Sequence, residues 1–282
     1  MHAQIDTNGV NLHVVQAGPH DGPLVLLLHG FPEFWYGWRA QIDFLAQAGF
    51  RVWAPDQRGY NLSDKPDGVR AYGIDHLAAD IVGLIDAAGC EKAVVVGHDW
   101  GGGVAWWTAI RHPQRVEKLV ILNSPHPGVM SHMLTSNFSQ LRKSWYMFAF
   151  QLPWLPEWLA LRNGARQSKN ALLVTSRPGT FSEDDLARYV EAWQRPNAMK
   201  SMIHWYRALF RSRPGLPGNV RVTVPTLILW GARDRFLGRE LAAESAQHCD
   251  NAKLVMFEQA SHWLQHEEAD AVNRHIVDFA RA

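Results

Sequence analysis

The residue with the clearest chemical potential is Asp99, at the centre of the segment Gly97-His98-Asp99-Trp100-Gly101. The segment joins an apolar run at 92–96, typical of a buried strand, to a predicted helix. A sharp strand-to-helix turn needs small residues two positions either side of its apex, and it exposes the apex side chain under backbone strain. A carboxylate there can displace a leaving group from a saturated carbon and form an alkyl ester. Alone, the segment could also be a tightly packed or phosphate-binding turn, although its glycine spacing does not match dinucleotide sites.

An ester on Asp99 needs a base that activates water, and His262 and Asp234 are positioned to provide it. Asp234 follows a predicted strand at 226–230, and His262 lies between the last predicted strand and the last helix. Both loops should lie at the carboxyl edge of a parallel sheet, beside Asp99. The Asp234 carboxylate could then orient the imidazole while its other nitrogen faces water. A loop aspartate usually caps a helix or forms a turn, but the order Asp99, Asp234, His262 is that of the α/β-hydrolase fold.

Two backbone N–H groups could stabilise the negative charge that develops when water attacks the ester. Phe31 lies in the segment His29-Gly30-Phe31-Pro32, directly after an apolar run at 25–28. Its N–H and that of Trp100 could together form an oxyanion hole. An ordinary turn at the end of a strand is the alternative interpretation of this segment.

Alternating strands and helices must position these residues. Apolar runs at 25–28, 51–54, 92–96 and 119–122 alternate with helices predicted over 34–48, 75–88 and 101–111. From 125 to 214 the pattern favours helices only, at 137–150, 156–162, 183–193 and 198–210, and strands return at 226–230 and 253–257. We therefore predict an α/β-hydrolase fold: a mostly parallel central sheet with helices on both faces. Residues 1–124 and 215–282 would form this core, and residues 125–214 an inserted all-helical cap over the ligand-binding edge.

Composition restricts the possible partners. The 28 basic and 27 acidic residues give a net charge of +1, so neither nucleic acid nor a membrane is expected as a partner. The 13 Trp and 12 Phe suggest an apolar pocket as well as a core. Two cysteines, no secretory signal and no long apolar segment predict a cytoplasmic protein. A monomer or a homodimer is expected, and nothing in the sequence decides between the two. Because no metal-ligand spacing is present, we expect no metal and no other cofactor.

The motifs together resemble the epoxide hydrolases of the α/β-hydrolase superfamily, particularly the soluble epoxide hydrolase subgroup. They are His29-Gly30-Phe31-Pro32, Gly97-His98-Asp99-Trp100-Gly101-Gly102, Gly231-Ala232-Arg233-Asp234 and Ser261-His262-Trp263. The likeness covers nearly the whole chain, including the cap. In this family two cap tyrosines hydrogen-bond the epoxide oxygen, and Tyr146 and Tyr206 lie in matching segments. A phenol, with a pKa of about 10, can donate that bond at neutral pH, although a tyrosine on an amphipathic helix is usually a packing residue.

The resemblance implies hydrolysis of small apolar epoxides to vicinal diols through a hydroxyalkyl ester on Asp99. In that scheme His262 and Asp234 activate water, Tyr146 and Tyr206 polarise the epoxide oxygen, and Phe31 and Trp100 also contact the substrate.

The same fold also permits three other activities and a role without catalysis. A haloalkane dehalogenase shares the aspartate nucleophile, and Trp100 could help to bind halide; that family usually has Asn where this chain has Phe31, and it does not need paired cap tyrosines. Fluoroacetate dehalogenases carry Arg where this chain has Trp100 and Gly103. A carboxylesterase would have Ser in place of Asp99. A non-catalytic ligand-binding protein on the same fold would commonly lack a catalytic residue or a glycine of the strand-to-helix turn around residue 99, which we call the elbow. This chain lacks none of them.

Overall fold

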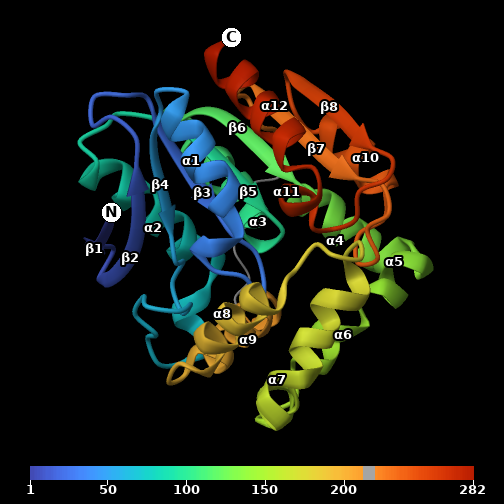
Figure 1. Cartoon of the computed structure of the whole chain (residues 1–282). Helices are drawn as coiled ribbons and strands as arrows, with labels where there is room; N and C mark the ends of the chain where they lie inside the picture. The colour runs from blue at the N-terminus through green and yellow to red at the C-terminus, as the bar shows by residue number, and fades with distance from the viewer. Residues whose placement is uncertain (212–219) are drawn as a thin grey trace.

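A single sheet organises the chain. In residues 1–211 and 220–282, which the computed structural model describes, eight strands lie in the order β1-β2-β4-β3-β5-β6-β7-β8 (Figure 1). They are β1 (His2–Thr7), β2 (Val10–Ala17), β3 (Leu24–Leu28), β4 (Arg51–Pro55), β5 (Ala93–His98), β6 (Val116–Leu122), β7 (Thr226–Gly231) and β8 (Ala252–Phe257). Neighbouring strands from β4 to β8 pair in parallel, whereas β2 pairs antiparallel with β1 and with β4. The predicted mostly parallel sheet is confirmed.

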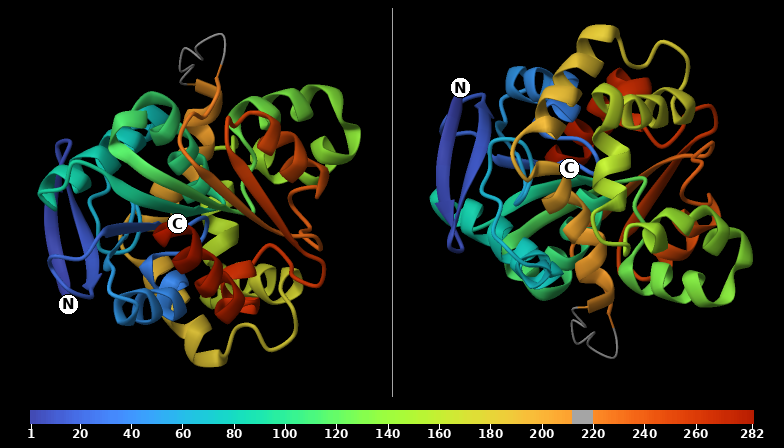
Figure 2. Two further views of the ribbon diagram at one scale, coloured as in Figure 1. Left: turned by 90° about the horizontal axis from the view of Figure 1, so that it is seen from above. Right: turned by 90° about the horizontal axis from the view of Figure 1, so that it is seen from below.

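Helices cover both faces of the sheet, so its central strands are apolar throughout. All five residues of β3 are buried: Leu24, Leu26 and Leu28 pack on one side, and Val25 and Leu27 on the other. Figure 2 shows α2 (Ile74–Ala87) and α3 (Trp100–Arg111) on one face, with α1 (Arg39–Gln47) and α12 (Ala269–Arg281) on the opposite face. The remaining helices of this part are α10 (Glu240–Gln247) and α11 (Leu264–Glu267), with short 3-10 turns at Trp35–Trp38, Val69–Tyr72 and Pro113–Arg115.

Between β6 and β7 the described residues form six helices and their connecting loops, and an isolated β-bridge joins Val222 to Cys249. The helices are α4 (Pro127–Ser136), α5 (Phe138–Lys143), α6 (Trp145–Ala149), α7 (Leu155–Thr175), α8 (Glu183–Gln194) and α9 (Ala198–Arg211). Helix α4 was not predicted, and it packs on α3 and α10. The predicted helix over 137–150 is divided at Ser144, and α7 is longer than predicted, with a kink over residues 162–165. The predicted boundary between residues 214 and 215 lies outside the described residues.

The hairpin of β1 and β2 was absent from the sequence-based prediction. Its turn residues Asn8 and Gly9 have φ of 45° and 73°, as the two central residues of a type I′ turn require. The Asn-Gly pair was therefore an available signal. Among the described residues, no helix combines the length and the apolar character needed to cross a bilayer.

Candidate active site

The turn from β5 into α3 has the steep geometry predicted for it. Asp99 adopts φ 51° and ψ −121°, a conformation that residues with a side chain rarely occupy. A Cβ on Gly101 would lie 2.1 Å from the carbonyl oxygen of Leu28, and one on Gly97 would lie 2.4 Å from that of Gly101. Glycine is therefore required at both positions because any side chain would overlap backbone.

The loop after β3 contacts the Asp99 side chain directly. The Phe31 N–H donates to Asp99 Oδ1 at 2.8 Å. This contact depends on Gly30, where a Cβ would lie only 2.4 Å from the Cβ of Asp99. Trp100 is the first residue of α3, so its N–H has no acceptor within the helix. The other Asp99 oxygen, Oδ2, lies toward the imidazole of His262.

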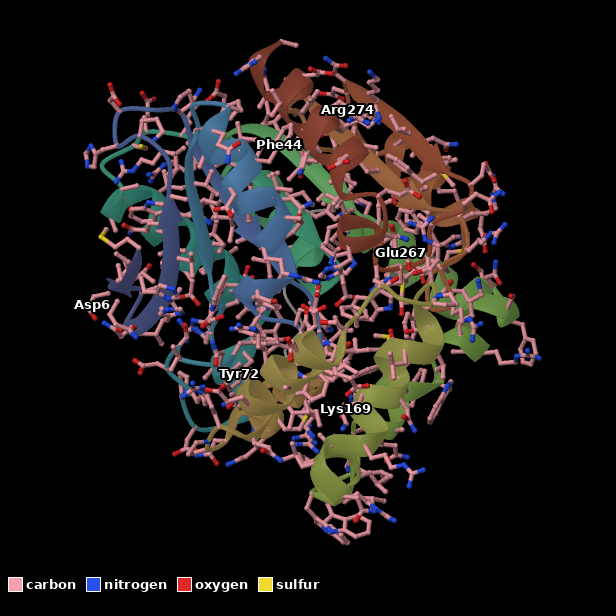
Figure 3. The ribbon with its side chains drawn as sticks, in the orientation of Figure 1. Asp6, Phe44, Tyr72, Lys169, Glu267 and Arg274 are labelled. Atoms are coloured by element: carbon pink, nitrogen blue, oxygen red, sulfur yellow. The ribbon has the colours of Figure 1, made fainter. Side chains whose placement is uncertain are left out.

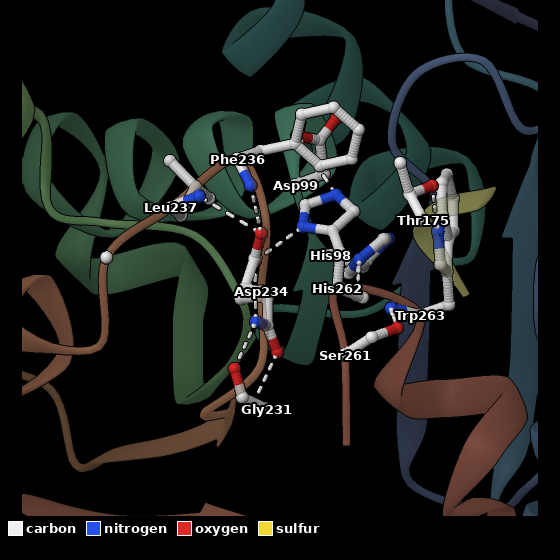
Figure 4. Close-up of polar contacts among 12 residues, drawn as sticks. His98, Asp99, Thr175, Gly231, Asp234, Phe236, Leu237, Ser261, His262 and Trp263 are labelled. Atoms are coloured by element: carbon white, nitrogen blue, oxygen red, sulfur yellow. Dashed lines mark hydrogen bonds and ion pairs between the residues drawn. The ribbon is translucent and has the colours of Figure 1, made fainter. Parts of the chain in front are cut away.

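His262 and Asp234 meet at the carboxyl edge of the sheet, as predicted (Figure 4). His262 Nδ1 lies 2.7 Å from Asp234 Oδ2, and His262 Nε2 lies 3.6 Å from Asp99 Oδ2. The Asp234 side chain is fully buried, and that of Asp99 is 15% exposed. One imidazole therefore joins a buried carboxylate to a carboxylate that faces a cavity.

Asp234 is held in place by groups that sequence reasoning did not identify. Its Oδ1 accepts from the N–H groups of Phe236 and Leu237 at 2.7 and 3.0 Å, and its Oδ2 accepts from Asn123 Nδ2 at 2.8 Å. The Asn123 amide oxygen in turn accepts from the Gly231 N–H at 2.8 Å. Asn123 directly follows β6, so a polar residue at the carboxyl end of a buried strand was the signal that could have revealed it.

The electrostatics of the pair follow from burial and charge. Burial favours the neutral form of each group, but the imidazole of His262 and the N–H donors outweigh it and lower the pKa of Asp234. Burial likewise opposes protonation of His262, yet the carboxylates of Asp234 and Asp99 dominate and raise its pKa to about 10. Before any reaction the site therefore holds an imidazolium between two carboxylates.

A second buried network supports His262 from behind. His98 Nε2 lies 2.8 Å from the backbone oxygen of His262, and His98 Nδ1 lies 3.3 Å from Glu33 Oε2. Glu33 also accepts from Tyr189 of α8 at 2.7 Å and from the Gln265 amide at 2.8 Å. Burial favours the neutral acid, but the neighbouring His266 and His98 hold the pKa of Glu33 well below its usual value. Sequence reasoning missed Glu33, although it directly follows the His29–Pro32 motif.

Tyr146 and Tyr206 both line the cavity that contains Asp99 and His262. The cavity has a volume of about 670 Å³ and mostly apolar walls from Phe31, α6, α7 and α9. The two tyrosine ring centroids lie 5.9 Å apart, and Tyr206 packs edge-on against Phe31 and Trp100 at 5.2 and 5.0 Å. The structure thus brings together all the residues that the sequence predicted for the site.

Both phenols are buried beside negative charge. Burial is the main cause that raises the pKa of Tyr146 above its usual value, and Asp99 and Asp234 add to it. Burial also raises the pKa of Tyr206, with contributions from Tyr146 and Asp99. Each hydroxyl therefore keeps its proton at neutral pH and can donate it to an oxygen in the cavity.

Comparison with known proteins agrees with this geometry. Residues 23–269 match the model of the alpha/beta hydrolase fold family. The chain is 48% identical to AB hydrolase superfamily protein YfhM of Bacillus subtilis (strain 168), over 98% of this chain and 96% of that protein. It is 39% identical to human epoxide hydrolase 4, over 99% of this chain and 78% of that protein.

The solved structures include a mutant epoxide hydrolase from Bacillus megaterium in complex with its product, a naphthyloxy-propane-1,2-diol. It superposes with a TM-score of 0.90 at 33% identity, covering 99% of this chain and 100% of that one. A further structure of the Bacillus megaterium enzyme, with an inhibitor, gives the same TM-score at 34% identity and the same coverage. The chain therefore belongs to the α/β-hydrolase fold family and, within it, to the epoxide hydrolases.

Proposed function

We propose that this chain hydrolyses small apolar epoxides to vicinal diols through a hydroxyalkyl ester on Asp99. The observation that carries the proposal is one apolar cavity that holds a carboxylate nucleophile, an imidazole 3.6 Å from it and two protonated phenols. The solved relatives with an inhibitor and a diol product support it. Residues 125–214 act as the cap that supplies the phenols.

The first step is ring opening. Asp99 Oδ2 attacks one epoxide carbon, and the bond between that carbon and the ring oxygen breaks. Tyr146 and Tyr206 donate hydrogen bonds to this oxygen, and one of them gives it a proton as the alkoxide forms. Asp99 Oδ1 becomes the carbonyl oxygen of the ester, still bonded to the Phe31 N–H. Trp100 and Phe31 contact the substrate at the base of the cavity.

Ester formation prepares the base for the second step. Asp99 loses its negative charge on alkylation, and that charge is one cause of the raised pKa of His262. The pKa of His262 therefore falls, and its proton returns to the phenolate. The neutral imidazole, oriented by Asp234, can now accept a proton from water.

Hydrolysis of the ester restores the enzyme. Water attacks the ester carbonyl as His262 takes its proton, and the N–H groups of Phe31 and Trp100 stabilise the oxyanion. The alkoxide leaves as the second hydroxyl of the diol, with the proton from His262. The proton left on the Asp99 carboxyl then moves to His262, which restores the imidazolium between two carboxylates. No metal or organic cofactor takes part.

The decisive experiment traps the ester. His262→Gln is incubated with an apolar aryl epoxide, and intact mass and peptide mapping are recorded. We expect an adduct of the mass of the epoxide to accumulate on Asp99, because the first step does not need a neutral imidazole and the second does. Asp99→Asn is the matched control and should form no adduct. An unmodified His262→Gln protein, or an adduct at another residue, would contradict the proposal.

The haloalkane dehalogenase alternative is separated by product. Wild-type protein is given an epoxide and a haloalkane with the same carbon skeleton, and diol and halide release are measured. We expect diol only, because two phenols converge on the leaving oxygen and Phe31 offers no side-chain donor to a halide. Halide release at a comparable rate would favour the alternative.

A further inference from the structure

The tip of the cap exposes an unusual amount of apolar surface. Of the 13 large hydrophobic side chains that are exposed among the described residues, ten lie between 138 and 210. All three of the exposed tryptophans are here: Trp145 is 66% exposed, Trp154 71% and Trp158 53%. Single exposed apolar residues are ordinary, whereas a concentration of them marks an interaction surface.

Six of these ten exposed side chains form two adjoining rows. On and after α6, Trp145, Phe148 and Leu152 follow at intervals of three and four residues, and the Phe148 ring contacts Phe210 of α9, with centroids 5.5 Å apart. Trp154 directly precedes α7, and Trp158 lies in its first turn, with its N–H bonded to the Trp154 carbonyl at 3.0 Å. Arg207 of α9 bonds to Leu152 and Glu157 and so joins the two rows. We call these six residues, Trp145, Phe148, Leu152, Trp154, Trp158 and Phe210, the cap tip.

Positive charge surrounds the cap tip. Residues 125–182 contain six Lys and Arg but only one acidic residue, a net charge of +5 in a chain whose total is +1. The acidic residue, Glu157, is paired with Arg207, and Arg177 is paired with Glu267 and Glu268. The other five cations form no ion pair with any residue in the described ranges: Arg142, Lys143, Arg162, Arg166 and Lys169. The Arg162 guanidinium instead lies over the Trp158 ring, 4.7 Å from its centroid.

The active-site cavity opens beside this surface. Its lining runs from Asp99 and His262 outward to exposed side chains of the cap, namely Arg142, Trp145, Leu152, Gln167 and Ala171, and to Arg235 of the core. Trp145 and Leu152 belong to both the opening and the cap tip. Figures 1 and 3 show α6 and α7, with Lys169, at the end of the molecule opposite α12 and Arg274.

We propose that the cap tip docks on an anionic lipid bilayer, so that the cavity opens toward the membrane in which apolar epoxides dissolve. Exposed tryptophans favour the interface between water and hydrocarbon, and unpaired cations are attracted by anionic headgroups. Nucleic acid does not account for the aliphatic side chain of Leu152 in the patch. A second copy of the chain would place its five unpaired cations against those of its partner. The net charge of +1 for the whole chain gave no reason to expect a membrane, because it hides the net charge of +5 in residues 125–182. The reason to dock rests on the proposed function, but docking itself does not require turnover.

Vesicle binding by the full chain tests the proposal without substrate. Protein is sedimented with vesicles of phosphatidylcholine alone and of phosphatidylcholine mixed with phosphatidylglycerol. We expect binding to the mixed vesicles at near-physiological ionic strength, weak binding to neutral vesicles and release at high salt. Failure to bind the mixed vesicles overturns the docking proposal and leaves the hydrolase proposal intact.

Two cap variants and one control locate the surface. The triple variant Arg162→Glu, Arg166→Glu and Lys169→Glu should weaken binding about a hundredfold or more, since each cation near an anionic surface contributes about fivefold. Trp154→Asn combined with Trp158→Ser should weaken it at least about tenfold; Asn suits position 154 because φ is 51° there. The control reverses three exposed cations far from the cap, Lys92→Glu, Lys253→Glu and Arg274→Glu.

The outcomes separate the possible occupants. Circular dichroism and diol formation from a water-soluble epoxide should be unchanged in all three variants, which shows that each is folded. Equal loss of binding in the cap and control charge variants would overturn the assigned surface. A stable dimer of the wild type, measured by light scattering in the absence of lipid and abolished by the tryptophan variant, would show that a second copy covers the cap tip and would also overturn the proposal.

Discussion

At the scale of single residues, the chemistry of this chain depends on which side chain lies at the apex of the elbow. The backbone there, with φ 51° at Asp99 and glycines on both sides, would present any short side chain to the cavity. A serine would attack acyl carbon, whereas the carboxylate is suited to saturated carbon. The Phe31 N–H already contacts Asp99 Oδ1. In the proposed mechanism it keeps this contact in the ester.

In the proposed mechanism, the phenols of Tyr146 and Tyr206 distinguish an epoxide from other substrates of a carboxylate nucleophile. We expect Tyr146→Phe and Tyr206→Phe each to slow ring opening about 10- to 100-fold, because one donor to the leaving oxygen remains. The double variant should lose a thousandfold or more, near the upper part of what general acid catalysis provides, about 10²–10⁴-fold. Single-turnover formation of the Asp99 ester is the measurement.

Substitution of a phenol elsewhere provides the control for the cap tyrosines. Tyr36 lies near the surface and bonds to Asp185 rather than lining the cavity. Tyr36→Phe should leave ring opening within about twofold. A double cap variant that opened epoxides at the wild-type rate would remove the basis for assigning proton donation to the cap.

The meeting of the three proposed catalytic residues could be predicted from the sequence because each follows a strand that has a clear apolar pattern. Asp99, Asp234 and His262 were identified by their order along the chain and by that placement. Glu33 and Asn123 were missed for a different reason: their partners are remote in the sequence. Tyr189 lies 156 positions from Glu33, and Asp234 lies 111 positions from Asn123. Asn123 also follows a buried strand, which marks it as a candidate, but only the folded chain shows which groups Asn123 and Glu33 bond to.

At the scale of elements, periodicity identified the sheet better than the helices of the cap. Continuous apolar runs predicted β3 to β8. The strands from β3 to β7 are mostly buried, as strands covered on both faces are, whereas β8 at the edge of the sheet is only partly buried. The β1–β2 hairpin was missed although Asn8-Gly9 predicts its turn. Local pattern did not predict the break at Ser144. The predicted helix over 156–162 ends where α7 kinks, at Asn163 and Gly164, but the helical residues after the kink were not predicted.

Two glycines of α3, Gly101 and Gly103, provide a matched pair of sites that tests how closely the turn at Asp99 packs on the end of β3. A methyl group on Gly101 would overlap the carbonyl oxygens of Leu28 and His29 at 2.1 and 2.5 Å, whereas one on Gly103 would meet only the Trp100 ring at 4.0 Å. We expect Gly101→Ala to lower the free energy of unfolding by about 3 kcal/mol or more. Gly103→Ala should raise it by about 0.5–1 kcal/mol, because alanine favours a helix.

Urea denaturation of the two alanine variants checks the prediction for α3. Each curve is compared with that of the wild type at the same pH, and the midpoint gives the sign of the change. Two variants of equal stability would mean that the close approach of α3 to the end of β3 does not restrict residue 101.

At the scale of the whole molecule, the site joins the cap to the core through buried charge. Tyr189 of α8 bonds to Glu33, and Glu33 connects to His98 and His266 behind the catalytic imidazole. Trp193 of α8 also donates to the Pro32 carbonyl at 2.6 Å. The charge distribution at this scale could not be predicted from the net charge of the chain. Residues 125–182 alone carry a net charge of +5 and contain five cations without an ion pair to any described residue, although the whole chain is nearly balanced.

The buried imidazolium makes global stability depend on pH in a defined direction. The folded-state pKa of His262, about 10, lies above its ordinary value of about 6.5. The folded protein therefore holds this proton more tightly than the unfolded chain. The resulting stabilisation is complete below about pH 6.5 and is lost as the pH rises to about 10. Its size is on the order of 3–5 kcal/mol, since each unit of pKa corresponds to about 1.4 kcal/mol.

Comparison of variants isolates this contribution from the other groups that titrate. Unfolding free energies of the wild type and His262→Gln are measured by urea denaturation between pH 6 and 10, within the range that the raised pKa of His262 sets. The advantage of the wild type over the variant should shrink steadily as the pH rises. Asp99→Asn removes one of the two carboxylates that raise the pKa of His262, so its loss of stability should begin at lower pH. A difference between wild type and His262→Gln that stayed constant over this range would mean that the imidazole is neutral before substrate binds, and the proton movements proposed for ring opening would then be wrong.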